Sequence, residues 1–145
     1  MQSRQLTLRL ALLGALPFAA FSVLLALGVR QIPWLGNVSE LLSSYSLVIA
    51  VFMCGIHWGQ YLQQNDQQFV NLFLVSNILT VLLWFAYLLI PVRLFLIFAL
   101  IVFIAILLID TRLLARSLIT ASYFKTRLIV TSVVGVFLLL AIYAI

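Results

Sequence analysis

The chain has 145 residues, of which 66% are hydrophobic and only 8% are charged, and its mean hydropathy is +1.30. A soluble domain carries roughly 25% charged residues, so this composition excludes an ordinary water-soluble protein and indicates that the bilayer is the solvent. The formal net charge of +5 does not indicate nucleic-acid binding, because the basic residues flank apolar runs instead of forming a basic face.

Five apolar segments are each long enough, or nearly so, to cross about 30 Å of hydrocarbon as an α-helix. They lack the strict alternation of a membrane β-barrel, and no linker divides the chain. The sequence therefore predicts a single all-α transmembrane domain, residues 1–145, built as a bundle of five helices. The expected helices cover residues 10–29, 45–62, 69–90, 94–109 and 128–145. We expect the first to be retained, because it is longer than the core of a signal peptide.

The basic residues predict the orientation of the bundle, because cytoplasmic loops carry an excess of lysine and arginine. With the N-terminus inside, the cytoplasmic segments hold Arg4, Arg9, Arg112, Arg116, Lys125 and Arg127. The outer loops hold Arg30 and Arg93. This distribution predicts a cytoplasmic N-terminus and a C-terminus on the opposite side. The segment 111–127 is weakly amphipathic, and we expect it to rest on the anionic inner leaflet.

The second helix carries "CGIHWGQ", residues 54–60, with the only histidine of the chain. At about 100° per residue, His57 shares one face with small and polar side chains. These are Ser43, Ser46, Ala50, Met53, Cys54, Gln60, Tyr61 and Gln64. Gly55 and Gly59 form Gly-x-x-x-Gly on the opposite side, which predicts the close approach of another helix. We therefore expect this helix at the centre of the bundle, with His57 facing protein or a small wet cavity.

Antiparallel pairing of the second and third helices places Asn77 about half a turn from His57. Asp110 and Arg127 lie near the same membrane surface, so the sequence allows a polar cluster of these four side chains, with Trp58 beside the histidine. These five residues are the candidate ligand-binding residues. An intramembrane histidine indicates a functional site, but a structural hydrogen bond is an equal alternative for His57. For Asp110 and Arg127 we favour a structural ion pair or contacts with lipid headgroups.

Met53, Cys54 and His57 present soft ligands on one side of the helix, the donor type that copper(I) prefers. Three such residues occur readily by chance, so we predict no metal site and no cofactor. Catalysis by the Cys54 thiol is disfavoured, because surroundings of low dielectric constant oppose the thiolate and no third residue orients the pair. Haem held by two histidines is excluded, since the sequence has one. An enzymatic activity is therefore not favoured.

Four motifs occur in order along the chain: "LGALPF" (13–18), "CGIHWG" (54–59), "LLID" before Arg112, and "YFKTRLIVTSVV" (123–134). Through them the chain resembles the small membrane family called domain of unknown function 3429, which includes transmembrane protein 69-like proteins. The resemblance spans nearly the whole chain and implies a multi-pass protein of the bacterial inner membrane, with relatives assigned to mitochondria. It implies no activity. Many members look to have glycine in place of Cys54, which argues against a shared catalytic thiol.

Three functions stay open from the sequence. We favour a non-catalytic accessory or assembly subunit of a membrane complex, because no interior acid–base pair is evident and the second helix has a glycine groove. The alternative is a binder of a small membrane ligand (quinone, haem or lipid) that uses His57. Transport fits less well, since no repeat or broken helix is visible. The expected partners are the lipid bilayer, and other membrane subunits or a second copy of the chain.

Overall fold

The computed structural model describes residues 9–63 and 71–145. Its helices are α2 (Leu16–Ala26), α3 (Val38–Gln63), α4 (Leu72–Leu89), α5 (Val92–Ala115) and α6 (Ala121–Ala144). Two short strands, β1 (Gln31–Ile32) and β2 (Gly36–Asn37), form an antiparallel hairpin between α2 and α3. Within the described residues, 5 helices are long and apolar enough to cross a membrane, the first of them over Arg9–Ala26. The predicted all-α bundle of five transmembrane helices is confirmed.

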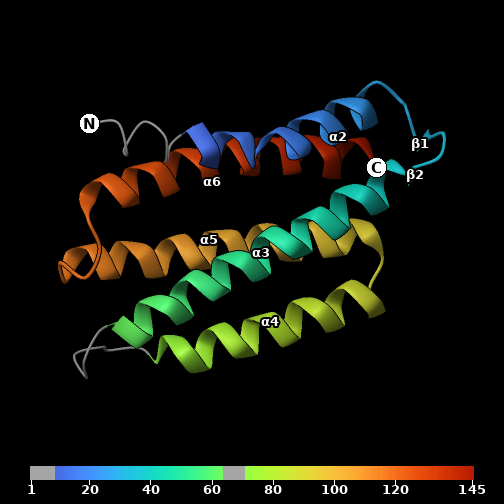
Figure 1. Cartoon of the computed structure of the whole chain (residues 1–145). Coiled ribbons are helices and arrows are strands. Elements are labelled where there is room, and N and C mark those ends of the chain that lie inside the picture. Colours follow the sequence, from blue (N-terminus) through green and yellow to red (C-terminus); the bar gives the residue numbers. More distant parts are fainter. Residues whose placement is uncertain (1–8, 64–70) are drawn as a thin grey trace.

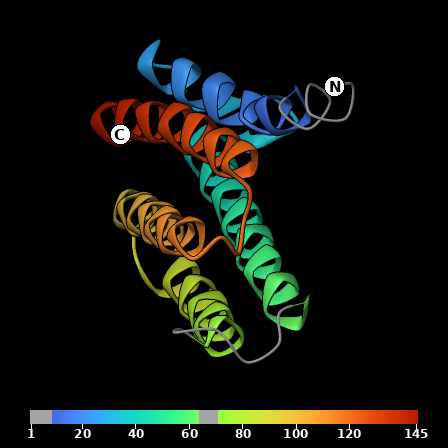
Figure 2. The same ribbon diagram turned by 90° about the vertical axis from the view of Figure 1, so that its left-hand side faces the viewer.

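Helix α3 crosses the molecule obliquely (Figures 1 and 2). On one side of it α2 packs along α6, and on the other α4 packs against α5, while α5 also packs against α6. Helix α3 itself packs against α2, α4 and α5, as expected for a helix at the centre of the bundle. Because α3 touches helices on both sides, a side chain on its buried face can meet side chains from helices that are distant in the sequence.

The core and the outer surface are both apolar, as a lipid solvent requires. Phe18 is fully buried and meets the rings of Tyr45 and Phe103 edge-on, at centroid distances of 5.1 and 6.1 Å. Outward-facing side chains such as Leu89 and Val136 are 76% and 65% exposed. A soluble protein rarely exposes apolar patches on this scale, so these surfaces fit contact with hydrocarbon.

The first crossing helix, Arg9–Ala26, is interrupted near its start by a turn at residues 14–15. Pro17 explains the interruption, because proline has no amide hydrogen and its ring clashes with the carbonyl of the residue four positions earlier. Tyr45 on α3 compensates: its hydroxyl donates a hydrogen bond of 2.9 Å to the carbonyl oxygen of Gly14. The turn therefore leaves that carbonyl satisfied at membrane depth, where an unpaired backbone group is costly.

Helices α5 and α6 are longer than the sequence predicts. The prediction placed them at residues 94–109 and 128–145, whereas α5 reaches Ala115 and α6 begins at Ala121. Asp110 directly follows the predicted fourth span and Arg127 directly precedes the predicted fifth, but the two are paired inside the bundle and neither ends its helix. Most of the segment 111–127 therefore belongs to the ends of α5 and α6, and its contact with the inner leaflet stays a prediction.

Helices α3 and α4 also differ from their predicted limits. Helix α3 begins at Val38 instead of residue 45, because the side chain of Asn37 accepts a hydrogen bond of 3.0 Å from the amide of Ser39. Helix α4 begins at Leu72 instead of residue 69, because the Asn71 side chain accepts a hydrogen bond of 3.0 Å from the amide of Leu74. Residues 69 and 70 of the predicted third helix lie outside the described residues.

The predicted packing of the Gly55–Gly59 face against another helix is wrong within the described part of the chain. A Cβ atom added at either glycine would meet nothing within 4 Å. The same face carries Val48 and Leu62, which are 61% and 71% exposed. The helices that pack on α3 use its other faces, where Ala50 and Cys54 are buried. The glycine face is therefore an open outer surface of this chain.

Candidate functional site

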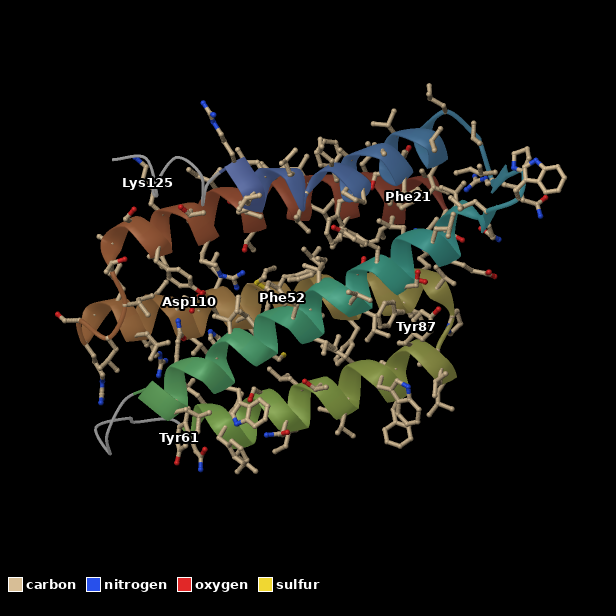
Figure 3. The ribbon with its side chains drawn as sticks, in the orientation of Figure 1. Phe21, Phe52, Tyr61, Tyr87, Asp110 and Lys125 are labelled. Carbon is tan, nitrogen blue, oxygen red and sulfur yellow. The ribbon has the colours of Figure 1, made fainter. Side chains whose placement is uncertain are left out.

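Three charged or titratable side chains from three helices meet inside the bundle. His57 of α3 lies 2.9 Å from Asp110 of α5, measured from Nε2 to Oδ1. Arg127 of α6 donates from Nε to the other carboxylate oxygen, Oδ2, at 3.1 Å. Asp110 is 0% exposed and His57 is 2% exposed. Figure 3 shows Asp110 on α5, toward the end of the bundle where α6 begins. We call these three residues the ionic cluster.

Helical periodicity explains how an aspartate reaches this depth. The buried positions of α5 follow the three- and four-residue spacing of a helix face and include Phe103, Ile106, Asp110 and Leu113. Asp110 therefore occupies a position where the pattern calls for an apolar side chain. Charged residues inside a membrane bundle are costly and are paired where they occur. Here both carboxylate oxygens have a partner.

The hydrogen-bonding roles follow from the charges. An ionised carboxylate only accepts hydrogen bonds, so opposite a charged Asp110 the Nε2 atom of His57 carries the hydrogen and donates. The cluster therefore combines an ion pair of Asp110 and Arg127 with an imidazole in contact with the same carboxylate. The expectation that the helices lack an interior acid–base pair is wrong.

Arg127 also ties the cluster to α3 through a second contact. Its Nη1 donates to the sulfur of Met53, and a thioether is a weak acceptor. Met53 and His57, two of the three soft ligands considered from the sequence, are thus in contact with other side chains of the protein. The Met53 sulfur faces Arg127, His57 Nε2 faces Asp110, and Cys54 is a buried free thiol.

The structure leaves two of the five candidate ligand-binding residues out of the cluster. Asn77 is exposed on α4 and donates from Nδ2 to the carbonyl of Phe73, at 2.7 Å. Trp58 is 47% exposed and its ring lies 5.8 Å from that of Phe73. The expected contact between His57 and Asn77 is wrong, because the histidine meets Asp110 of α5 and the asparagine turns back onto its own helix.

Two more polar residues lie beside the cluster. Gln60 follows His57 by three positions on α3 and was placed on the face of His57 from the sequence. Tyr123 precedes Arg127 by four positions on α6 and was not a candidate, although this spacing places it on the helix face of Arg127. The side-chain oxygens Oε1 of Gln60 and Oη of Tyr123 are buried and have no hydrogen-bond partner among residues 9–63 and 71–145.

A cavity of about 410 Å³ lies between α6, α3 and the first crossing helix, and Arg127 and Tyr123 form part of its wall. Its other lining residues are almost all apolar. They are Leu10, Ala11, Gly14, Phe18, Ile49, Phe52, Met53, Ile56, Thr126, Val130 and Val134. A larger hollow of about 630 Å³ lies at residues 31–36 of the β1–β2 hairpin, but it has no charged side chain in its wall. The cavity beside the ionic cluster is therefore the candidate binding site.

Comparison with known families identifies a family model that covers nearly the whole chain. A family model described as protein of unknown function (DUF3429) matches residues 3–143. No curated protein and no solved structure matches the chain. The matched segment contains all three residues of the ionic cluster and every residue that lines the cavity beside it.

Proposed function

The chain belongs to the DUF3429 family, and since the description of that family assigns no activity, we propose a function from the geometry. We propose that this multi-pass membrane protein binds a small amphipathic membrane ligand in the cavity between α3, α6 and the first crossing helix. One observation carries the proposal: an apolar cavity of about 410 Å³ whose wall includes Arg127, which is bonded to the buried Asp110. Ligand sites have this size and combine apolar walls with a few polar groups.

The cavity is accessible from the lipid side. Leu10 and Phe52 belong to its wall and are 59% and 61% exposed on the outer surface of the bundle. An apolar chain that enters from the bilayer exchanges one apolar environment for another, so its burial supplies little driving force. The polar end of the ligand must then supply most of the selectivity. Among the polar groups of the wall, Arg127 belongs to the ionic cluster.

Site-directed photo-crosslinking tests the proposal. Benzoylphenylalanine placed at Phe52, in the cavity wall, should capture one ligand species at a stoichiometry near one per chain. The same group at Phe85, 48% exposed on α4, serves as the matched control and should capture the bulk lipids in proportion to their abundance. The captured species are identified by mass spectrometry. If both positions capture the same lipid distribution, the cavity does not select a ligand and the proposal fails.

A second candidate, an accessory or assembly subunit, is supported by the open glycine face of α3. Gly55 and Gly59 lie on an exposed helix face that no described residue covers, and small residues allow close approach of a helix from another subunit or a second copy. Gly55→Leu combined with Gly59→Leu should remove the partner, while the thermal stability of the isolated chain is retained. A partner that co-purifies unchanged with this variant would contradict the assembly role.

We further propose a location in the bacterial inner membrane, with the N-terminus in the cytoplasm. The start of the first crossing helix and the α5–α6 connection lie at one end of the bundle, and α6 ends at the other (Figure 1). The first of these ends carries Arg9, Arg112, Arg116, Lys125 and Arg127, which favours the cytoplasm. A reporter enzyme fused after Ile145 should be active only in the periplasm, and cytoplasmic activity would contradict this orientation.

A further inference from the structure

The cavity beside the ionic cluster is elongated along the bundle axis. Its wall on α6 begins at Tyr123 and ends at Val134, which is about 16 Å of helix at about 1.5 Å per residue. The first crossing helix starts at the same end of the bundle as α6, whereas α3 runs in the opposite direction (Figure 1). Leu10 and Tyr123 therefore mark one end of the cavity, near the α5–α6 connection, and Phe18 and Val134 mark the other.

The burial of the wall changes from one end of the cavity to the other. Leu10 is exposed on the outer surface of the bundle, and so is Phe52, which lies closer to the middle of the bundle than Asp110 does (Figure 3). At the far end, Phe18 and Val134 are buried in the core. This gradient predicts that a ligand enters from the end near the α5–α6 connection and that packed side chains close the far end.

The polarity of the wall changes in the same direction. Along α6 the polar side chains of Tyr123, Thr126 and Arg127 come first, and the apolar side chains of Val130 and Val134 follow. The walls from the first crossing helix and α3 consist of apolar side chains and one glycine. The polar end is thus the exposed end, which fits an amphiphile that enters the bundle with its apolar part first.

Arg127 supplies hydrogen-bond donors at the polar end of the cavity. Its Nε donates to Asp110, and its Nη1 donates to the sulfur of Met53, which also lines the cavity. The contact with Met53 therefore places the guanidinium against the cavity wall. A guanidinium has five N–H donors and no acceptor, and it suits the oxygen atoms of phosphate and carboxylate groups. The head that fits beside it offers acceptor oxygen atoms.

The cavity is narrow for its length. A volume of about 410 Å³ spread over about 16 Å leaves a mean cross-section of about 25 Å². Such a cross-section accommodates one extended hydrocarbon chain, whereas a fused ring system is too wide for it. The apolar part of the ligand is therefore a single chain.

We infer that the ligand is a single-chain amphiphile whose acyl chain lies along α6 toward Val134 and whose head, bearing acceptor oxygen atoms, lies at Arg127. It enters from the leaflet on the side of the α5–α6 connection. Lysophospholipids and fatty acids share this chemistry. This ligand class rests on the proposed ligand-binding function and adds to it the chemistry and the orientation of the bound molecule.

Photo-cross-linking of the full-length chain in phosphatidylcholine nanodiscs tests the orientation. The probes are two palmitoyl lysophosphatidylglycerols, one with a diazirine at the end of the chain and one with a diazirine beside the ester. The chain-end probe should label Phe18 and Val134, which bulk lipid does not reach because both are buried. The ester-side probe should label Leu10 and Thr126. Reversed positions, or labelling confined to outward-facing side chains such as Val136, would overturn the inference.

Competition by unlabelled amphiphiles tests the chemical class. Palmitoyl lysophosphatidylglycerol and palmitate represent the two sources of a head with acceptor oxygen atoms, and hexadecyltrimethylammonium has a similar chain but no acceptor. At equal excess, at least one of the first two should lower the labelling of Val134 about fivefold more than the ammonium compound does, the scale expected for one hydrogen bond. The stronger competitor identifies the source. If neither exceeds the ammonium compound, the assigned class is wrong.

The variant Arg127→Lys tests the contact with the head, because lysine keeps the charge opposite Asp110 but lacks the guanidinium fork. Capture of both probes should fall about five- to tenfold. The matched control is Arg93→Lys, which changes an exposed arginine outside the cavity wall and should label as the wild type does. Equal capture by Arg127→Lys and the wild type would contradict the contact. The labelling map and the competition use the wild-type chain, so they decide the inference even where Arg127→Lys does not fold.

The cross-link at Phe52 judges the proposed function separately. One selected species without an acyl chain, captured there, would support ligand binding and overturn the ligand class assigned to the cavity. A labelling map that places the head of the probe at Val134 would overturn the orientation and leave ligand binding standing.

Discussion

Replacing Arg127 with methionine should lower the free energy of unfolding by about 3–5 kcal/mol, because the change leaves a buried carboxylate without its counter-charge. Asp110 is fully buried, and Arg127 supplies a permanent positive charge in direct contact with it. His57 would remain as its partner at 2.9 Å. Methionine keeps the length of the apolar part of the arginine side chain, so the loss reports the charge and its hydrogen bond. Unfolding in mixed micelles measures the change.

Two further variants test whether the loss of stability comes from the unpaired carboxylate of Asp110. Arg93→Met removes an exposed arginine near the other end of α5 and should change the stability by less than about 0.5 kcal/mol. Asp110→Leu added to Arg127→Met should recover most of the lost stability, since replacing a whole buried ion pair with apolar residues is often neutral or stabilising. A double variant less stable than Arg127→Met alone would contradict the assignment of the loss to an unpaired carboxylate.

The sequence was sufficient to predict five crossing helices, because a spanning helix needs about 20 apolar residues and little else. It also indicated His57, Asp110 and Arg127 as one cluster, since these residues lie near the same predicted membrane surface. An ion pair of Asp110 and Arg127 was one of the two favoured alternatives, and the structure contains it. The contact between His57 and Asp110 could not be derived, because it depends on α5 continuing as a helix past Asp110. Hydropathy alone does not show this continuation, because a paired charge lowers the apolar average without ending a helix.

Two predictions for the centre of the bundle are wrong for related reasons: the contact of His57 with Asn77, and the packing of the Gly55–Gly59 face. Asn77 was placed beside His57 from the assumed pairing of two helices, and an error of one or two residues in that register rotates a side chain to another face. The Gly55–Gly59 pattern predicts close helix approach, but it does not state whether the neighbour belongs to the same chain. A cavity shaped by three helices has no signature in any one of them, so the sequence could not reveal it.

Filling the cavity should abolish ligand binding while the fold is kept. Ala11 lines the cavity, and Ala11→Phe would place an aromatic ring in the space meant for the apolar chain of the ligand. Ala20, on the same crossing helix, is exposed on the outer surface, so Ala20→Phe is the matched control and should behave like the wild type. Leu10 and Phe52 of the cavity wall are exposed, so we expect the added ring to be accommodated without unfolding the bundle.

Native mass spectrometry of the chain released from nanodiscs decides whether the cavity holds a ligand, because it counts bound molecules. We expect one retained molecule per chain for the wild type and for Ala20→Phe, and none for Ala11→Phe at an unchanged melting temperature. A wild-type spectrum without a retained molecule, or a molecule retained equally by Ala11→Phe, would show that the cavity beside Arg127 is not a ligand site.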